Sequence, residues 1–178
     1  MRPDMPETYA KMYQHPEYRM RQWRRDALSV YLTRNMPSNI LDVGCGRGES
    51  LKVARECGVV IAHGCEIVES LCGPQVTYLP EGAVKLPFRD NHYQMVVCMD
   101  VLEHLEPEEV PLAIQELRRV AAWKMFVSVP HKQERNGLHL TVEPREWWID
   151  QLSKVGEVEV IDLPVPEIKQ PYTFFEIR

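Results

Sequence analysis

Long apolar runs are missing from this sequence, and their absence bears on where the protein can act. No run approaches the roughly 18 residues that a membrane-spanning helix requires, and the N-terminal stretch is polar where a signal peptide would be apolar. We therefore expect a cytoplasmic protein with no membrane partner. These features leave the oligomeric state open.

Cysteine pairs with metal-binding spacing and an excess of positive charge are missing as well. The five cysteines include no C-x-x-C pair, so a zinc site is not expected, and an odd number of cysteines in a reducing compartment is typical of reduced thiols. The formal net charge of −5 gives no general attraction to phosphate backbones. Nucleic acid is therefore not the expected partner, although a local basic patch is compatible with one.

The length of 178 residues is sufficient for one domain with a sizeable core. We expect a single domain over residues 1–178, with an N-terminal helical cap over 1–36 and the core over 37–178. No repeat or low-complexity tract marks a second domain. In the cap, four apolar or aromatic residues recur at helical spacing: Trp23, Ala27, Leu28 and Tyr31.

From Asn39 onward, short apolar segments alternate with amphipathic ones. This alternation predicts a parallel sheet with helices packed against it. The predicted strands are 39–43, 60–65, 75–79, 93–99, 124–129, 157–163 and 172–177. The predicted helices are 49–57, a brief turn over 68–72, a helix that Pro107 starts and that extends to Val120, and 144–155.

The most informative stretch is the turn between the first predicted strand and the helix after it. Asp42 precedes glycines at every second position, Gly44, Gly46 and Gly48, where missing side chains allow positive φ and a close approach of a ligand to the backbone. A dinucleotide fingerprint would need glycine at position 49, which is Glu49. The stretch instead resembles motif I of the class I S-adenosylmethionine (SAM)-dependent methyltransferases.

Further motifs of that family follow in order over roughly residues 39–131. Glu66 ends the second predicted strand, where the family has an acidic residue that accepts hydrogen bonds from the ribose hydroxyls, and Ile67 is an apolar neighbour for adenine. Before Leu-Pro-Phe, the chain has Gly82 where relatives usually place a carboxylate, with Glu81 one residue early. The resemblance therefore implies adenine contact by the backbone around Gly82 and Ala83.

The resemblance implies a Rossmann-like α/β fold: a mostly parallel sheet of seven or slightly fewer strands, helices on both faces, and an antiparallel last strand. It also implies SAM as cofactor. Tyr13 lies in an aromatic segment that resembles family segments folding over bound SAM, and simple packing is the alternative. The implied cofactor-binding residues are Tyr13, Asp42, Gly44, Cys45, Gly46, Gly48, Glu66, Ile67, Gly82, Ala83, Met99 and Asp100.

Three histidines near the carboxyl ends of the strands are candidate general bases. Methyl transfer from SAM is an in-line displacement that depends chiefly on holding the acceptor close and aligned, and a hydroxyl acceptor also needs a base. The candidates are His104, His131 and His139, and each is equally compatible with a structural or solvent-facing role.

A metal site is the second interpretation of this region, and metal-free catalysis is the favoured one. Asp100, Glu103 and His104 are spaced i, i+3, i+4, and His139 can complete a set of oxygen and nitrogen ligands suited to Mg²⁺ or Mn²⁺. The pattern resembles two metal-assisted groups, the quinone-biosynthesis O-methyltransferases and the small-RNA 3′-terminal ribose methyltransferases.

We expect a methyltransferase for a small-molecule acceptor, with oxygen as the favoured acceptor atom and nitrogen or carbon as the alternatives. The acceptor is expected between the N-terminal helix and loops 131–142 and 163–171. Trp147 and Trp148 are candidate pocket walls or core residues. One alternative is an RNA ribose 2′-O-methyltransferase assisted by a metal at Asp100, Glu103, His104 and His139. Residues 18–25, which interleave arginines with aromatics, favour a nucleic-acid substrate. The other is a non-methylating SAM-binding or SAM-cleaving protein. Substrate choice in this fold is determined by variable loops rather than by the fold itself.

Overall fold

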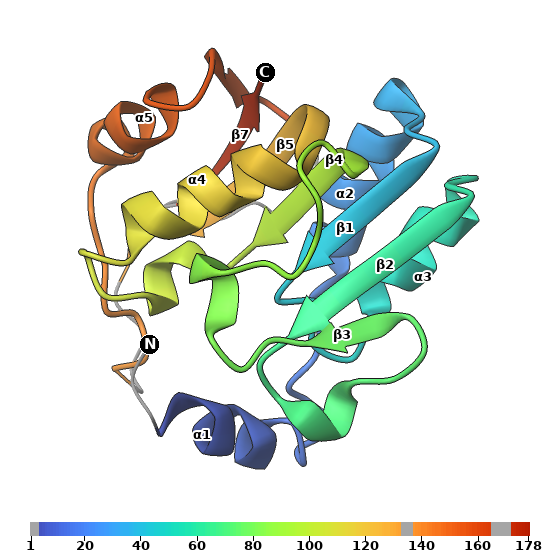
Figure 1. The fold of residues 1–178 in the computed structure, drawn as a ribbon, viewed down its shortest axis with the longest axis vertical. Helices are drawn as coiled ribbons and strands as arrows, with labels where there is room; N and C mark the ends of the chain where they lie inside the picture. Colours follow the sequence, from blue (N-terminus) through green and yellow to red (C-terminus); the bar gives the residue numbers. More distant parts are fainter. Residues whose placement is uncertain (1–3, 133–136, 165–171) are drawn as a thin grey trace.

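A seven-stranded sheet forms the centre of the computed structural model, which describes residues 4–132, 137–164 and 172–178 (Figure 1). The strand order is β3-β2-β1-β4-β5-β7-β6, and β7 runs antiparallel to both of its neighbours while the other paired strands are parallel. The strands are β1 (Asn39–Val43), β2 (Ile61–Glu66), β3 (Val76–Tyr78), β4 (Tyr93–Met99), β5 (Ala121–Pro130), β6 (Val158–Ile161) and β7 (Tyr172–Ile177). The predicted Rossmann-like fold is thus confirmed.

Helices cover both faces of the sheet (Figure 1). They are α1 (Met5–Met12), α2 (Gln22–Asn35), α3 (Glu49–Glu56), α4 (Val110–Val120) and α5 (Arg145–Ser153), with short 3₁₀ turns η1 (Glu69–Leu71), η2 (Gly82–Val84) and η3 (Leu102–His104). Because side chains alternate along a strand, Ile40 packs into the core under α2 and α3, whereas Leu41 and Val43 pack into the core under α4 and α5. The sheet is therefore buried on both faces, as a parallel sheet requires.

The N-terminal segment contains two helices with different surroundings. α2 buries Ala27, Leu28 and Tyr31 against the sheet, as the helical spacing predicts, so α2 belongs to the packing of the core. α1 instead packs Met5 and Tyr9 in a smaller cluster with Val68 and Leu138, near the carboxyl ends of the parallel strands. No helix in the described parts of the chain is long and apolar enough to cross a membrane.

Most predicted elements have the expected position, with shifts at a few ends. β5 begins at Ala121 rather than at residue 124, because Ala121 still pairs with Tyr93 across a register shift. α4 begins at Val110, since the residues after Pro107 form turns that lead into the helix. The five apolar residues predicted for the inner face of α4 are all buried: Val110, Ala113, Ile114, Leu117 and Val120.

Candidate functional site

The glycine turn after β1 has a backbone that side chains would disrupt. Gly44 and Cys45 both donate their N–H groups to the carbonyl of Cys65, at 2.9 and 3.1 Å. Gly44 has φ +76°, and a Cβ there would lie 2.4 Å from Cγ2 of Val101. Gly46 has φ +52°, and its Cβ would lie 2.5 Å from Oη of Tyr13. The glycines therefore let the turn pass directly under these two side chains.

Two buried carboxyl groups flank this turn. Asp42 accepts a hydrogen bond from the hydroxyl of Ser50, and burial raises the pKa of Asp42 to about 7. Glu66 accepts hydrogen bonds from three backbone N–H groups, those of Gly46 at 2.8 Å, Ile67 at 2.8 Å and Val68 at 3.1 Å. Burial raises the pKa of Glu66, although these hydrogen bonds oppose the shift. The turn and the end of β2 are thus locked together by Glu66.

Two adjoining cavities lie over the turn. The glycine-turn cavity, of about 320 Å³, is lined by the turn itself, the start of α2, the end of β4 and η3. The Glu66 cavity, of about 90 Å³, is lined by Glu66, Ile67, Leu79, Gly82 and Ala83, with α1 above it. Both cavities share a further set of lining residues: Tyr13, Tyr18, Gly44, Asp100 and His104.

The structure brings nearly all the predicted cofactor residues to these cavities. Asp42, Cys45, Gly46 and Met99 line the glycine-turn cavity. Gly48 lines neither cavity and instead caps α3, with φ +72°. Glu81, which stands one residue before the position expected for an acidic side chain, pairs with Lys85 at 2.7 Å on the exposed side of η2. The side chain of Glu81 is thus directed away from the cavity.

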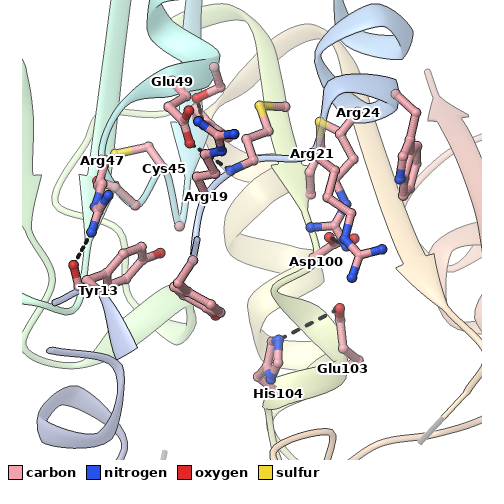
Figure 2. A pocket seen from close by; sticks show the side chains of 18 of the residues that line it. Tyr13, Arg19, Arg21, Arg24, Cys45, Arg47, Glu49, Asp100, Glu103 and His104 are labelled. Atoms are coloured by element: carbon pink, nitrogen blue, oxygen red, sulfur yellow. Dashed lines mark hydrogen bonds and ion pairs between the residues drawn. The ribbon is translucent and has the colours of Figure 1, made fainter. Parts of the chain in front are cut away.

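Asp100 is held by residues that are far away in the sequence (Figure 2). It has φ +57°, outside the helical turn of η3, so the predicted single helical turn of Asp100, Glu103 and His104 does not form. Its carboxylate pairs with Arg24 and accepts hydrogen bonds from Tyr172 and, at 3.4 Å, from Ser128. Burial raises the pKa of Asp100 to about 6, and the guanidinium of Arg24 opposes the shift.

Glu103, His104 and His139 form a compact cluster in the lining of the glycine-turn cavity. One potential ligand atom from each lies within 4.8 Å of the others, and Glu103 is fully buried. His104 donates Nδ1–H to the carbonyl of Leu138 at 3.0 Å, and His139 donates Nδ1–H to the carbonyl of Lys132 at 2.8 Å. A neutral ring held in this way carries its lone pair on Nε2, which is the atom that a metal or a proton would take.

The remaining candidates have structural surroundings. Among the described residues, His131 lines neither cavity, and its ring bonds the carbonyl of Glu143 at 3.1 Å and the hydroxyl of Thr173 at 2.7 Å. Trp148 is fully buried in the core, and Trp147 packs against the same core. The predicted acceptor loop 163–171 lies mostly outside the described residues, as do positions 133–136 of the loop 131–142.

Three contributors to the site were not singled out from the sequence. Ser50 lies on the first turn of α3 facing Asp42, and a hydroxyl eight residues after that carboxylate is the only local signal. Arg24 and Tyr172 reach Asp100 from α2 and β7. No short-range pattern connects them to Asp100, because their contact depends on the folded sheet.

Curated relatives of the chain share about half of it. A ubiquinone biosynthesis O-methyltransferase from Nitrosospira multiformis is 27% identical over 103 residues, which are 51% of this chain and 43% of that protein. A probable tRNA methyltransferase 9B from Mus musculus is 32% identical over 94 residues, or 48% of this chain and 20% of that protein. The match thus spans less than half the length of these relatives.

Comparison with solved structures and with families gives a consistent result. The Burkholderia thailandensis 1,6-didemethyltoxoflavin-N1-methyltransferase, solved with S-adenosylhomocysteine bound, is similar in fold, with a TM-score of 0.74 and 15% identity over 98% of this chain and 86% of that one. A family described as a methyltransferase domain matches residues 13–152. The chain therefore belongs to this family of class I SAM-dependent methyltransferases, whose cofactor is SAM.

Proposed function

We propose that the protein transfers the methyl group of SAM to an oxygen atom of a small-molecule acceptor. The observation that carries the proposal is the junction of the two cavities at Gly44 and Asp100. In the proposed arrangement the adenosine part of SAM occupies the Glu66 cavity and the methionine part occupies the glycine-turn cavity. The acceptor occupies the remainder of the larger cavity, whose volume suits a small molecule.

In this arrangement each group of residues has a separate task. Glu66 accepts a hydrogen bond from the ribose hydroxyls, because the three backbone N–H groups use three of the roughly four lone-pair sites of its carboxylate and leave one on Oε2. The backbone at Gly82 and Ala83 contacts adenine, since Glu81 is engaged with Lys85. The proposed cofactor set is Tyr13, Asp42, Gly44, Cys45, Gly46, Gly48, Glu66, Ile67, Gly82, Ala83, Met99 and Asp100.

The proton of a hydroxyl acceptor requires a base near the transferred methyl group. His104 lines both cavities and His139 lines the larger one, whereas both ring nitrogens of His131 are hydrogen-bonded away from them. We therefore assign the base to His104 or His139. The backbone carbonyls that hold Nδ1 of each ring fix the tautomer in which Nε2 accepts a proton.

The cluster of Glu103, His104 and His139 also fits a divalent cation. One buried carboxylate and two imidazoles with oriented Nε2 atoms are a suitable mixed donor set, and Asp100 is not part of it because Arg24 and Tyr172 engage its carboxylate. A cation bound there would lower the pKa of an acceptor hydroxyl. This metal-assisted alternative uses the same SAM and acceptor sites as the histidine-base mechanism. Only the group that activates the acceptor hydroxyl differs.

Calorimetry with S-adenosylhomocysteine tests the cofactor site. We expect binding by the wild-type protein and affinity at least about tenfold weaker in Glu66→Gln, because an amide NH₂ group, which only donates, replaces one of the two oxygens that accept hydrogen bonds. Glu69→Gln, an exposed neighbour on η1, is the matched control and should bind normally. If the folded wild-type protein binds neither SAM nor S-adenosylhomocysteine, the proposal is wrong. Consumption of SAM without any acceptor would indicate a SAM-cleaving protein instead.

Electron paramagnetic resonance of added Mn²⁺ tests the cation site without depending on activity. If the cluster holds a cation, we expect Mn²⁺ to bind to wild-type protein and Glu103→Gln to weaken binding at least about tenfold, since the only carboxylate of the cluster is lost. Glu108→Gln, which changes an exposed carboxylate just before α4, is the control. Equal Mn²⁺ binding by wild type and Glu103→Gln would leave the histidine base as the activating group.

A further inference from the structure

Three arginines from one short segment line the glycine-turn cavity: Arg19, Arg21 and Arg24 (Figure 2). Arg24 pairs with Asp100. Arg19 and Arg21, by contrast, make no hydrogen bond or ion pair through their side chains to any part of the chain that the structure describes, and both are exposed at the cavity. The mouth of the cavity therefore presents two guanidinium groups that lack an anionic partner.

The neighbouring arginines differ in this respect. Arg25 lies 4.0 Å from a carboxylate oxygen of Glu49 and 3.9 Å from one of Glu56. Arg47 donates hydrogen bonds to the carbonyl of Tyr13 and, at 3.3 Å, to that of His15. Arg25 thus faces carboxylates of α3, and Arg47 supports the backbone of residues 13 and 15. Of the arginines that line the cavity, those at positions 19 and 21 are without such a partner in the described parts of the chain.

The cofactor does not supply enough negative charge to match these groups. SAM carries one carboxylate, one ammonium and one sulfonium, so its net charge is positive, and its cations favour the acidic side of the cavity at Asp42 and Asp100. The single carboxylate of SAM can form a bidentate pair with at most one arginine. The acceptor is the remaining occupant of this cavity, and an anionic group on the acceptor would pair with the second arginine.

Aromatic side chains stand next to these arginines. Tyr18 contacts Tyr13 edge to face, with ring centroids 5.0 Å apart, and Trp23 contacts Tyr172 in the same way at 4.8 Å. Tyr13, Tyr18 and Trp23 all line the cavity. A planar ring can pack against such walls while guanidinium groups bind a substituent at its edge.

We infer that the acceptor is an aromatic carboxylate whose carboxylate group is bound by Arg19 and Arg21 beside the Tyr18 and Trp23 rings. This inference rests on the proposed methyltransferase function and specifies its substrate class. A hydroxyl of the same acceptor receives the methyl group. A new C–O bond forms as the C–S bond breaks, the sulfur keeps the electron pair and becomes a neutral thioether, and the hydroxyl proton passes to the base.

The binding of benzoate and benzamide tests the inference, because these probes share a shape and differ in charge. Affinities are measured with and without saturating S-adenosylhomocysteine. We expect wild-type protein to bind benzoate at least about tenfold more tightly than benzamide, and the double variant Arg19→Gln, Arg21→Gln to lose this preference. Arg34→Gln, an exposed arginine in the last turn of α2, is the control for lost positive charge and should keep it.

Other results would overturn the inference. Equal binding of benzoate and benzamide by wild type would show that the cavity does not select a carboxylate. If the double variant weakens S-adenosylhomocysteine but not 5′-methylthioadenosine, which lacks the amino-acid part, the arginines bind the cofactor's carboxylate. If wild-type protein binds single-stranded RNA and the double variant does not, the segment contacts phosphates. Because the probes are also measured without cofactor, failure of SAM binding is distinguishable from failure of the arginine subsite.

Discussion

Gly44 is the residue where backbone conformation and close packing coincide most directly. Its φ is +76°, and a Cβ would meet Cγ2 of Val101, which directly follows Asp100. We expect Gly44→Ala to destabilise the fold by about 2 kcal/mol through left-handed strain and displacement of Val101. We also expect the affinity for S-adenosylhomocysteine to fall at least about tenfold, because the displaced loop lines both cavities. Urea denaturation and calorimetry measure the two effects.

Gly58→Ala separates strain from packing in this prediction. Gly58 has φ +87°, yet nothing lies within 4 Å of its would-be Cβ. We expect a loss of about 1 kcal/mol from strain alone and unchanged affinity for S-adenosylhomocysteine. If Gly44→Ala behaved like Gly58→Ala in both measurements, close packing under Val101 would not be what the turn requires.

At the residue scale, sequence reasoning succeeds where the signal is local. Asp42 and Glu66 are identifiable because each lies near the carboxyl end of a strand within a recognisable motif, and both lie at the cavities. The environment of Asp100 was not identifiable, since Tyr172 is 72 residues away and Arg24 lies on a helix before the first strand. The positive φ of Asp100 is likewise not predicted by a spacing rule for helices.

At the scale of elements, a buried charge network joins α2, β5 and β7. Glu176 of β7 accepts hydrogen bonds from the hydroxyl of Tyr31 at 2.6 Å and from Nζ of Lys124 at 3.0 Å. Burial alone would raise the pKa of Glu176, but these bonds and one from Arg178 lower it below its usual value. The network connects the antiparallel end of the sheet to the helix that carries Arg24.

We expect Glu176→Gln to destabilise the protein by about 3 kcal/mol, because it leaves the ammonium of Lys124 buried without its counter-charge. Glu159→Gln, which removes an exposed partner of Arg178, should change stability by less than about 0.5 kcal/mol. The free energies of unfolding from urea titrations give both values. A similar small effect for the two variants would contradict the assignment of the network as a stabilising connection.

Helices and strands, like single residues, are predictable from the sequence where the signal is local. β1, β4 and β7 have the predicted bounds, because each is a short apolar run with clear ends. α1 is not distinguished by the sequence pattern as a separate helix within the expected cap. It has only eight residues, and its buried side chains Met5 and Tyr9 pack against Val68 and Leu138, which are distant in sequence. Its position thus depends on tertiary contacts rather than on periodicity.

At the scale of the whole molecule, carboxyl groups near the site and far from it have opposite tendencies. Burial raises the pKa of Asp42, Glu66 and Asp100, which meet at the cavities. A hydrogen bond from Arg119 lowers the pKa of Glu116. Hydrogen bonds from Tyr31, Lys124 and Arg178 lower the pKa of Glu176. Both carboxylates stabilise parts of the fold that are distant from the site. The site therefore concentrates groups that resist ionisation, and a cationic cofactor is the kind of ligand that favours their ionised forms.

The raised pKa of Asp42 predicts how the stability of the protein changes with pH. Because this pKa is raised from 3.8 to about 7, the folded protein keeps a proton that the unfolded chain releases between about pH 4 and 7. The wild type should therefore lose stability relative to Asp42→Asn as the pH rises through this window, by up to about 1.4 kcal/mol per pH unit, with no further change above it. Urea denaturation of both proteins from pH 4 to 8.5 measures the difference.

The variant is suited to this test because asparagine retains a side-chain oxygen that can accept the hydroxyl of Ser50. Asp26→Asn, on an exposed position of α2, controls for removal of a carboxylate elsewhere. The quantity compared is the free energy of unfolding of wild type minus that of Asp42→Asn. If this difference stays constant or increases from pH 4 to 7, Asp42 is ionised in the folded protein throughout that range. In that case, in the proposed cofactor arrangement, the positive charges of SAM would meet a carboxylate that is already charged, and SAM binding would release no proton from Asp42.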